Sequence, residues 1–351
     1  MMRSRLLNVG FALTLIGSVI TGAGAAQAST PLPTPENPGG VEAATSPGGI
    51  PSTRQGAELH TFIAAKAAAG ITPGMWPRGA NDFSCKPKKG QNPIVLIPGT
   101  IEDAFSAWSF YSPHLRNAGY CVYTFNYNPS TNPTNDSTSF AGDIRQSAAF
   151  MAGFVDRVLK ATGAKKVDLI GHSQGGGPLP RAYIKWYGGA SKVNHLIGLV
   201  PSNHGTTMWG LKNLIRDVLK EAPSLKEEII DKHNRTSLLQ QLEGSPFLKE
   251  LNEGGLTVPG VKYTVITTKL DLVVTPYTNA IIDEPGVKNE VVQNVCGLDA
   301  HGHQNFTYDP VAYQMVVNAL NPAEAKPVNC WWIPPYLPAP KDPAPAPAPA
   351  S

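Results

Sequence analysis

A Gly-His-Ser-Gln-Gly sequence at positions 171–175 limits the folds open to this chain, because of what stands on either side of it. An apolar run at 167–170 comes directly before it, and a run with helical spacing follows at 179–186. A serine on a tight turn from strand to helix needs small residues two positions away on both sides, and the helix N-terminus favours developing negative charge. We therefore predict Ser173 as a nucleophile; the alternative is an ordinary glycine-rich turn.

The same alternation of strand and helix continues along the chain. Apolar runs closed by Pro, Gly or polar residues predict buried strands, and a helical spacing of apolar residues that ends at Gly163 predicts a long helix. The expected strands are 93–99, 121–125, 167–170, 195–200 and 262–268, and the expected helix is 140–162. Together with the serine turn, this order predicts an α/β-hydrolase fold with a mostly parallel, doubly wound sheet.

Residues 206–256 interrupt this alternation between two expected strands. Apolar side chains repeat there with helical spacing, at Leu211, Leu214, Ile215, Val218 and Leu219. We expect a helical cap over the edge of the sheet, whose leucines and Trp209 would form an acyl-binding wall. The alternative for part of the segment is a set of crossover helices that pack on the sheet.

The two ends of the chain differ in composition from the rest. Two arginines, an apolar stretch at 6–20 and small residues up to Ala28 predict a cleaved signal peptide at 1–28, with an uncleaved membrane anchor as the alternative. Residues 29–56 are rich in Pro, Gly, Ser and Ala and are expected to be a flexible linker, and 338–351 a Pro/Ala-rich tail. The catalytic domain is expected at 57–337, in a secreted protein.

Composition and cysteine content exclude several classes of protein. A net charge of +3 over 351 residues, without a long basic run, gives no support for nucleic-acid binding. The four cysteines show no CxxC spacing and no Cys/His cluster, so we expect no metal site. An even number fits disulfides in an oxidising compartment, with three possible connectivities, of which Cys85–Cys121 and Cys296–Cys330 are local in sequence; four free thiols are the alternative.

A serine nucleophile needs a base, and the base needs a carboxylate to orient it. On this fold the acid and then the histidine follow the serine in the chain. Asp271 comes just after the expected strand at 262–268 and is the predicted acid, with Asp283 and Asp299 as alternatives. For the base, local sequence leaves His301 and His303 nearly equal.

Acyl transfer also requires donors for the oxyanion. The backbone N–H of Gln174, directly after the nucleophile, is the first candidate. The loop Ile97-Pro98-Gly99-Thr100 after an early strand is the second, with the Thr100 hydroxyl as an additional donor; the alternative is that these are only turn residues.

Four segments together resemble the actinobacterial class 2 lipases and the Candida antarctica lipase B-like group. They are the Pro-Gly-Thr strand end at 95–100, Ser-Gln-Gly-Gly at 173–176, the segment after Asp271 up to Pro276, and Asn-Val-Cys-Gly at 294–297. The resemblance runs from about Cys85 to Cys330. It implies that Thr100 and Gln174 build the oxyanion hole, and it implies the two sequence-local disulfides.

The resemblance also selects the base. In the actinobacterial relatives the catalytic histidine stands a short, fixed interval before Tyr-Asp-Pro, and His303 fits this interval before 308–310 better than His301. The expected function is a secreted serine lipase that cleaves triacylglycerols through an acyl-enzyme, without metal or organic cofactor. Its expected partners are a lipid or other ester substrate, with the lipid–water interface as an additional hypothesis, and no nucleic acid or stable partner protein.

Two other functional classes are left open by the sequence. A carboxylesterase, or a hydrolase of polyesters such as cutin, would use the same residues on a different substrate, because the fold and the triad do not determine the pocket. A non-catalytic cell-surface binding protein with an inactive triad is the alternative from outside the enzymes.

Overall fold

A computed structural model describes residues 51, 53–127, 141–231, 234–330, 332 and 334. The predicted signal peptide (1–28), almost all of the predicted linker and the predicted tail (338–351) lie outside the described residues. The predicted linker boundary differs from the structure, because Arg54–Gln55 form a short strand, β1, that pairs in parallel with β2 (Met75–Trp76). The folded part therefore begins before residue 57.

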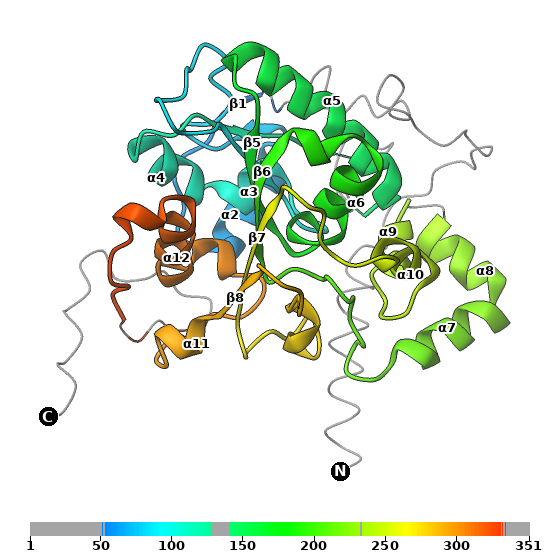
Figure 1. Cartoon of the computed structure of the whole chain (residues 1–351). Helices are drawn as coiled ribbons and strands as arrows, with labels where there is room; N and C mark the ends of the chain where they lie inside the picture. The colour runs from blue at the N-terminus through cyan, green and yellow to red at the C-terminus, as the bar shows by residue number, and fades with distance from the viewer. Residues whose placement is uncertain are drawn as a thin grey trace, which may run out of the picture.

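A six-stranded parallel sheet forms the centre of the molecule (Figure 1). Its strands lie in the order β4-β3-β5-β6-β7-β8, and the register places Ile94 beside Val122 on one side and Asp168 on the other. The bounds are β3 Ile94–Ile97, β4 Val122–Thr124, β5 Val167–His172, β6 Val193–Leu199, β7 Lys262–Thr267 and β8 Lys288–Val291. The five strands predicted from apolar runs are all present.

Strand β8 was not predicted, and its composition explains why. Its sequence is Lys-Asn-Glu-Val, which lacks an apolar run, and its first two residues are exposed. It lies at the edge of the sheet, where a strand has only one neighbour and charged residues are common.

Helices cover both faces of the sheet, each with its own apolar core (Figure 1). The side chains of one strand alternate between the faces, so that Ile94 and Leu96 belong to one core and Val95 and Ile97 to the other. The first face carries α2 (Phe62–Ile71), α3 (Ala104–Trp108), α4 (Tyr111–Asn117), α11 (Val292–Val295) and α12 (Pro310–Leu320). The second carries α5 (Ile144–Thr162) and α6 (Pro178–Trp186), which confirms the predicted doubly wound architecture.

Helix α5 shows how the local sequence sets an element's ends. The Asp143 side chain accepts hydrogen bonds from the N–H groups of Arg145 and Gln146 at its start. Gly163 ends it in the left-handed conformation, with φ of 76°. The apolar stripe between these ends packs on β3, β4 and β5 in the second core.

The segment between β6 and β7 is helical, as predicted, but its first and second parts pack differently against the rest of the protein. It contains α7 (Lys212–Glu221), α8 (Pro223–Lys226), a π-helical turn (Glu227–Asp231), α9 (Thr236–Gln240) and α10 (Pro246–Asn252). No residue of α7 is buried, whereas α10 buries Phe247, Leu248 and Leu251 in the second core beside α6. In Figure 1 α7 and α8 lie at the periphery, so the cap is the first part, and α10 packs as an ordinary crossover helix.

Among the described helices, none combines the length and the apolar composition that a membrane crossing requires.

Candidate active site

Ser173 lies where β5 ends and a 3-10 turn (Ser173–Gly176) begins. Its φ of 56° is in the left-handed region, which an L-residue adopts only under strain. A Cβ atom at Gly171 would lie 1.7 Å from the carbonyl oxygen of Gly175, and one at Gly175 would lie 2.2 Å from that of Pro98. The small residues around Ser173 are therefore required by backbone contacts, as the turn predicted.

Asp271 and His303 form a buried hydrogen-bonded pair next to Ser173. The Nδ1 of His303 donates to Oδ2 of Asp271 over 2.8 Å. The other carboxylate oxygen, Oδ1, accepts the backbone N–H groups of Val273 and Val274, both at 2.8 Å. These contacts fix the carboxylate as an acceptor, so Nε2 is the ring nitrogen of His303 that can act as a base. Ser173 and His303 line the same cavity.

The alternative acids and the alternative base lie elsewhere. Asp283 is exposed, and Asp299 accepts the backbone N–H of His301 at 2.8 Å. The ring of His301 is fully buried, and its Nε2 lies 3.0 Å from Nδ2 of Asn305. Of the candidates left open by local sequence, only Asp271 and His303 are brought together beside Ser173.

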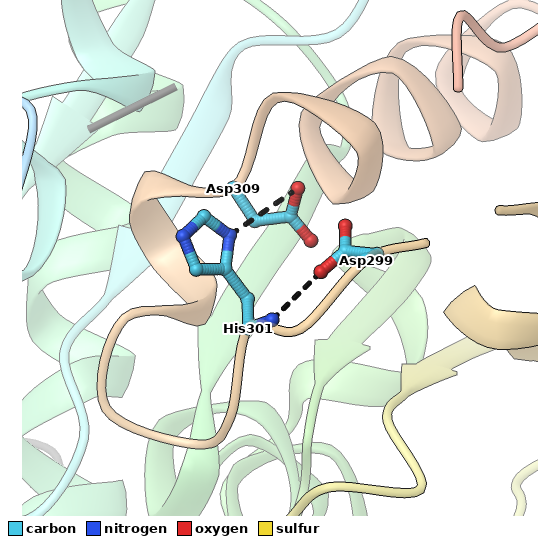
Figure 2. A group of neighbouring side chains, drawn as sticks. All are labelled: Asp299, His301 and Asp309. Carbon is cyan, nitrogen blue, oxygen red and sulfur yellow. Dashed lines mark hydrogen bonds and ion pairs between the residues drawn. The ribbon is translucent and has the colours of Figure 1, made fainter. Parts of the chain in front are cut away.

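Asp299, His301 and Asp309 form a buried cluster whose oxygen and nitrogen atoms lie within 4.8 Å of one another (Figure 2). Burial and the neighbouring Asp309 raise the pKa of Asp299 to about 8, so that one carboxyl of the cluster holds a proton at neutral pH. Asp309 also accepts the N–H of Val311 at 2.7 Å, which begins α12.

The donor set of this cluster does not suit a cation. The amide of Asn305 is fixed in orientation, because its oxygen accepts the N–H of Phe62 at 2.9 Å. Its NH₂ group therefore faces Nε2 of His301, and the neutral imidazole carries its proton on Nδ1, the nitrogen that faces Asp309 at 3.7 Å. In this tautomer Nδ1 has no free lone pair, so a metal ion could bind there only by displacing the proton.

Thr100 and Gln174 are joined by Gln241, which directly follows α9 and was not among the predicted site residues. Nε2 of Gln241 donates to Oγ1 of Thr100 at 2.9 Å and to Oε1 of Gln174 at 3.0 Å. Ser202 donates to the oxygen of the Gln241 amide at 2.8 Å, which fixes the orientation of that amide. Because the Thr100 oxygen accepts here, its O–H can donate toward the cavity that Thr100, Ser173 and Gln241 line. No local motif marks Gln241, which lies in a different segment from both partners.

The cavity above Ser173 has a volume of about 500 Å³ and is mainly apolar. All five residues of the predicted apolar face of α7 and its preceding turn line it. Trp209, which was predicted to contribute, is not among the lining residues; its neighbour Met208 is. Val273 and Val274, which follow Asp271 in the chain, line it as well. The cap and the loop after Asp271 thus contribute to an apolar space suited to a hydrocarbon chain.

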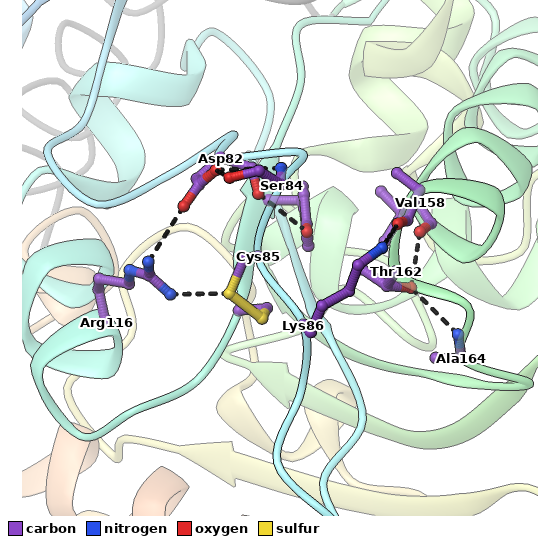
Figure 3. The surroundings of a disulfide bond; sticks show 11 residues. Asp82, Ser84, Cys85, Lys86, Arg116, Val158, Thr162 and Ala164 are labelled. Atoms are coloured by element: carbon purple, nitrogen blue, oxygen red, sulfur yellow. Dashed lines mark hydrogen bonds and ion pairs between the residues drawn. A yellow bond between two sulfur atoms is a disulfide. The ribbon is translucent and has the colours of Figure 1, made fainter.

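Both sequence-local disulfides are present in the structure. Cys296 and Cys330 are joined, as are Cys85 and Cys121. Figure 3 shows the second bond, where Nη1 of Arg116 lies 2.7 Å from Sγ of Cys85 and the same guanidinium pairs with Asp82 at 3.1 Å. This bond connects the segment before β3 with the start of β4.

The chain is similar to a known protein family and to several solved structures. A family model described as Lipase (class 2) matches residues 91–316. Aspergillus fumigatus lipase B is 22% identical, with a TM-score of 0.54 over 72% of this chain, and this chain covers 56% of that lipase. A Bacillus licheniformis lipase is 16% identical, with a TM-score of 0.48; the match covers 67% of this chain and 94% of that lipase. A Bacillus subtilis carboxylesterase is 14% identical, with a TM-score of 0.44 over 74% and 97% of the two chains.

Proposed function

The chain belongs to the class 2 lipase family of carboxylic ester hydrolases, and we propose that it is a secreted serine lipase that cleaves triacylglycerols through an acyl-enzyme on Ser173. The observation that carries this proposal is that one apolar cavity is lined by both Ser173 and His303, and that His303 is hydrogen-bonded to Asp271. The family match alone supports ester hydrolysis, and the cavity adds the class of acyl group.

In the first half of the reaction, His303 accepts the hydroxyl proton of Ser173 at Nε2 while the serine oxygen attacks the ester carbonyl. Asp271 keeps the proton of Nδ1 in place and stabilises the imidazolium that forms. The tetrahedral oxyanion is stabilised by the Thr100 hydroxyl and the backbone N–H of Gln174. His303 then gives its proton to the leaving alcohol, and the acyl group stays on Ser173.

In the second half, a water molecule takes the place of the alcohol. His303 removes a proton from this water as it attacks the acyl carbonyl, and the same donors stabilise the second oxyanion. The carboxylic acid leaves when His303 returns the proton to Ser173. All proton transfers are thereby assigned to one histidine, and the side chains described here supply every acid–base step.

The exposed apolar side chains of the cap support the proposal that the substrate is insoluble in water. Leu214 and Val218 of α7 line the cavity, and yet their exposed fractions are 58% and 42%. Side chains that face both the cavity and the surface would contact a lipid layer while the acyl chain enters between them. We infer that α7 lies at the lipid–water interface during catalysis. Secretion is supported by the two disulfides, which persist in oxidising compartments.

The test is the initial rate of hydrolysis of a short-chain triglyceride, measured below and above its solubility limit, with Ser173→Ala as the control. A lipase should accelerate when the substrate forms an emulsion, and the variant should lose this activity. A plateau below the solubility limit would indicate a carboxylesterase for soluble esters instead. Equal rates in both proteins would refute the serine mechanism.

A further inference from the structure

A second acid–imidazole pair lies directly under the candidate site. Nδ1 of His172 lies 2.9 Å from Oε2 of Glu102, and Nε2 of the same ring lies 2.9 Å from the backbone carbonyl oxygen of His303. The exposed fractions of His172 and Glu102 are only 1% and 3%. The rings of His172 and His303 are 4.9 Å apart. His172 belongs to the serine turn, and the mechanism gives it no proton to transfer.

The hydrogen bonds place a proton on each nitrogen of the His172 ring. A carbonyl oxygen only accepts, so Nε2 donates to His303. At the other nitrogen, Oε2 of Glu102 already accepts the backbone N–H of Gly99 at 2.8 Å and is therefore an acceptor for Nδ1 as well. Burial alone would raise the pKa of Glu102 and lower that of His172, but their mutual attraction outweighs burial, so the pKa of Glu102 is lowered and that of His172 is raised. Both the hydrogen bonds and the two pKa directions favour an imidazolium facing a carboxylate.

The contacts of this pair reach the three loops that carry the proposed oxyanion donor, nucleophile and base. Glu102 closes the turn that begins at Gly99 and contains Thr100. His172 is the residue before Ser173. Its Nε2 holds the backbone of His303 itself. The turn is tight, because a Cβ at Gly99 would lie 2.9 Å from Oε2 of Glu102 and 3.0 Å from Nδ1 of His172.

We propose that Glu102 and His172 form a positioning pair that sets the Thr100 turn and the backbone of His303 relative to Ser173. This inference rests on the proposed serine mechanism. Both residues line the cavity, but neither exchanges a proton with the substrate in the proposed mechanism. Its effect is on the relative placement of nucleophile, base and oxyanion donor, where an error of about 1 Å costs on the order of a hundredfold in rate.

An isosteric change separates this role from simple packing. In Glu102→Gln, the atom that replaces Oε2 is either an oxygen or an NH₂ group. An oxygen still accepts from Gly99, but the doubly protonated His172 then has no buried counter-charge. An NH₂ group can donate to a neutral His172, but it then opposes the N–H of Gly99. Glutamine therefore fits the space and cannot keep both contacts.

The matched control is Asp168→Asn, the same chemical change in another buried carboxylate. Asp168 lies at the start of β5, whereas Ser173 follows the end of that strand. The Asp168 carboxylate accepts hydrogen bonds from the side chains of Asn92 at 3.3 Å and Asn194 at 2.7 Å. We expect both variants to be folded and to lose thermal stability. On a soluble short-chain p-nitrophenyl ester, we expect kcat of Glu102→Gln to fall about tenfold to a hundredfold with KM nearly unchanged, while Asp168→Asn keeps the wild-type kcat.

A second readout does not depend on turnover. In NMR spectra of protein labelled with ¹⁵N-histidine, the wild type should show one histidine with two protected ring N–H groups above pH 7. The absence of this signal from His172→Asn would assign it to His172. We expect the signal to be altered in Glu102→Gln. A wild-type kcat in Glu102→Gln, a loss no larger than its unfolded fraction, or the absence of this signal from the wild type would each overturn the inference. If the wild type hydrolysed no ester and did not react with a fluorophosphonate, the proposed function would fail and the positioning role with it, although the signal would still report the ion pair.

Discussion

Thr100 is a residue whose role depends on a single proton. Its oxygen accepts a hydrogen bond from Gln241, and Gln241 is itself held by Ser202. The hydroxyl proton is thereby directed away from the glutamine, toward the cavity. A valine at this position would have nearly the same shape but no donor.

We expect Thr100→Val to lower kcat/KM on a soluble ester by about a hundredfold, because one oxyanion donor is lost, and Thr100→Ser to lose only a few-fold. Steady-state kinetics of the three proteins on p-nitrophenyl butyrate would measure this. Equal losses in the valine and serine variants would show that the hydroxyl does not stabilise the oxyanion and that Thr100 is only a turn residue.

At the scale of elements, α7 is unusual because its apolar face is not buried against the body of the protein. Leu214, Ile215 and Val218 line the cavity, and no residue of the helix is buried. An amphipathic helix usually covers its apolar face in the core. The cost of leaving this face open is reduced when an acyl chain or a lipid layer covers it.

A charge on this face should change the preference for acyl-chain length. We expect Val218→Asp to lower the rate on long-chain esters roughly tenfold relative to short-chain ones, because a long chain would bury the new carboxylate or avoid the face. Asn213→Asp is the control, since residue 213 is exposed on the same helix and does not line the cavity. Parallel changes in both variants, across p-nitrophenyl esters of increasing length, would argue against α7 as the acyl-binding wall.

At the scale of the whole molecule, the C-terminal segment is held by the disulfide between Cys296 and Cys330, which are 34 positions apart. Cys296 is fully buried in the first core and stands seven positions before His303 in the chain. The link thus joins the segment before His303 to the chain beyond α12.

Removing this link should destabilise the fold. Closing a loop of this length is worth about 3–4 kcal/mol, so the Cys296→Ala/Cys330→Ala variant should melt roughly 10 °C below the wild type. Calorimetry under oxidising conditions measures the difference. A reducing agent should decrease the difference in melting temperature between the wild type and the variant. An unchanged melting temperature in the variant would show that the disulfide adds no stability.

His195 on β6 is one of the groups that make stability depend on pH, and substituting it isolates its contribution. Burial, helped by Lys262 and Lys288, lowers its pKa to about 4, and its Nε2 lies 2.9 Å from Oγ1 of Thr264. The unfolded chain binds the proton near pH 6.5 and the folded one only near pH 4. His195 therefore adds no pH-dependent cost above pH 6.5, and it destabilises the fold progressively as the pH falls between these values.

We expect the free energy of unfolding of the wild type to fall relative to His195→Gln by about 2–3 kcal/mol between pH 7 and pH 4. Glutamine can keep a hydrogen bond to Thr264 but does not titrate. Urea unfolding of both proteins at several pH values gives the difference directly. A difference that stays constant over this range would contradict the assignment.

The local sequence determined the elements and the chemistry of single positions. Apolar runs of four to seven residues predicted the five strands β3 to β7, because a strand buried on both faces is mostly apolar. Gly171 and Gly175 predicted the turn of Ser173, because only a missing side chain allows such close backbone contacts. Resemblance to a family, rather than local physics, selected His303 over His301.

Only the tertiary structure decided what contacts span distant parts of the chain. Gln241 joins Thr100 to Gln174, and Glu102 joins the Thr100 turn to His172, and neither contact leaves a periodic pattern or a motif in the sequence. The edge strand β8 also lacks a sequence pattern, because charged residues at an exposed edge can remain in contact with solvent. The sequence by itself determined the five strands β3 to β7, the long helix α5 and which residue could be the nucleophile, because these follow from neighbours in the chain. The structure decided which side chains meet, because hydrogen bonds between loops depend on how the sheet and its helices bring those loops together.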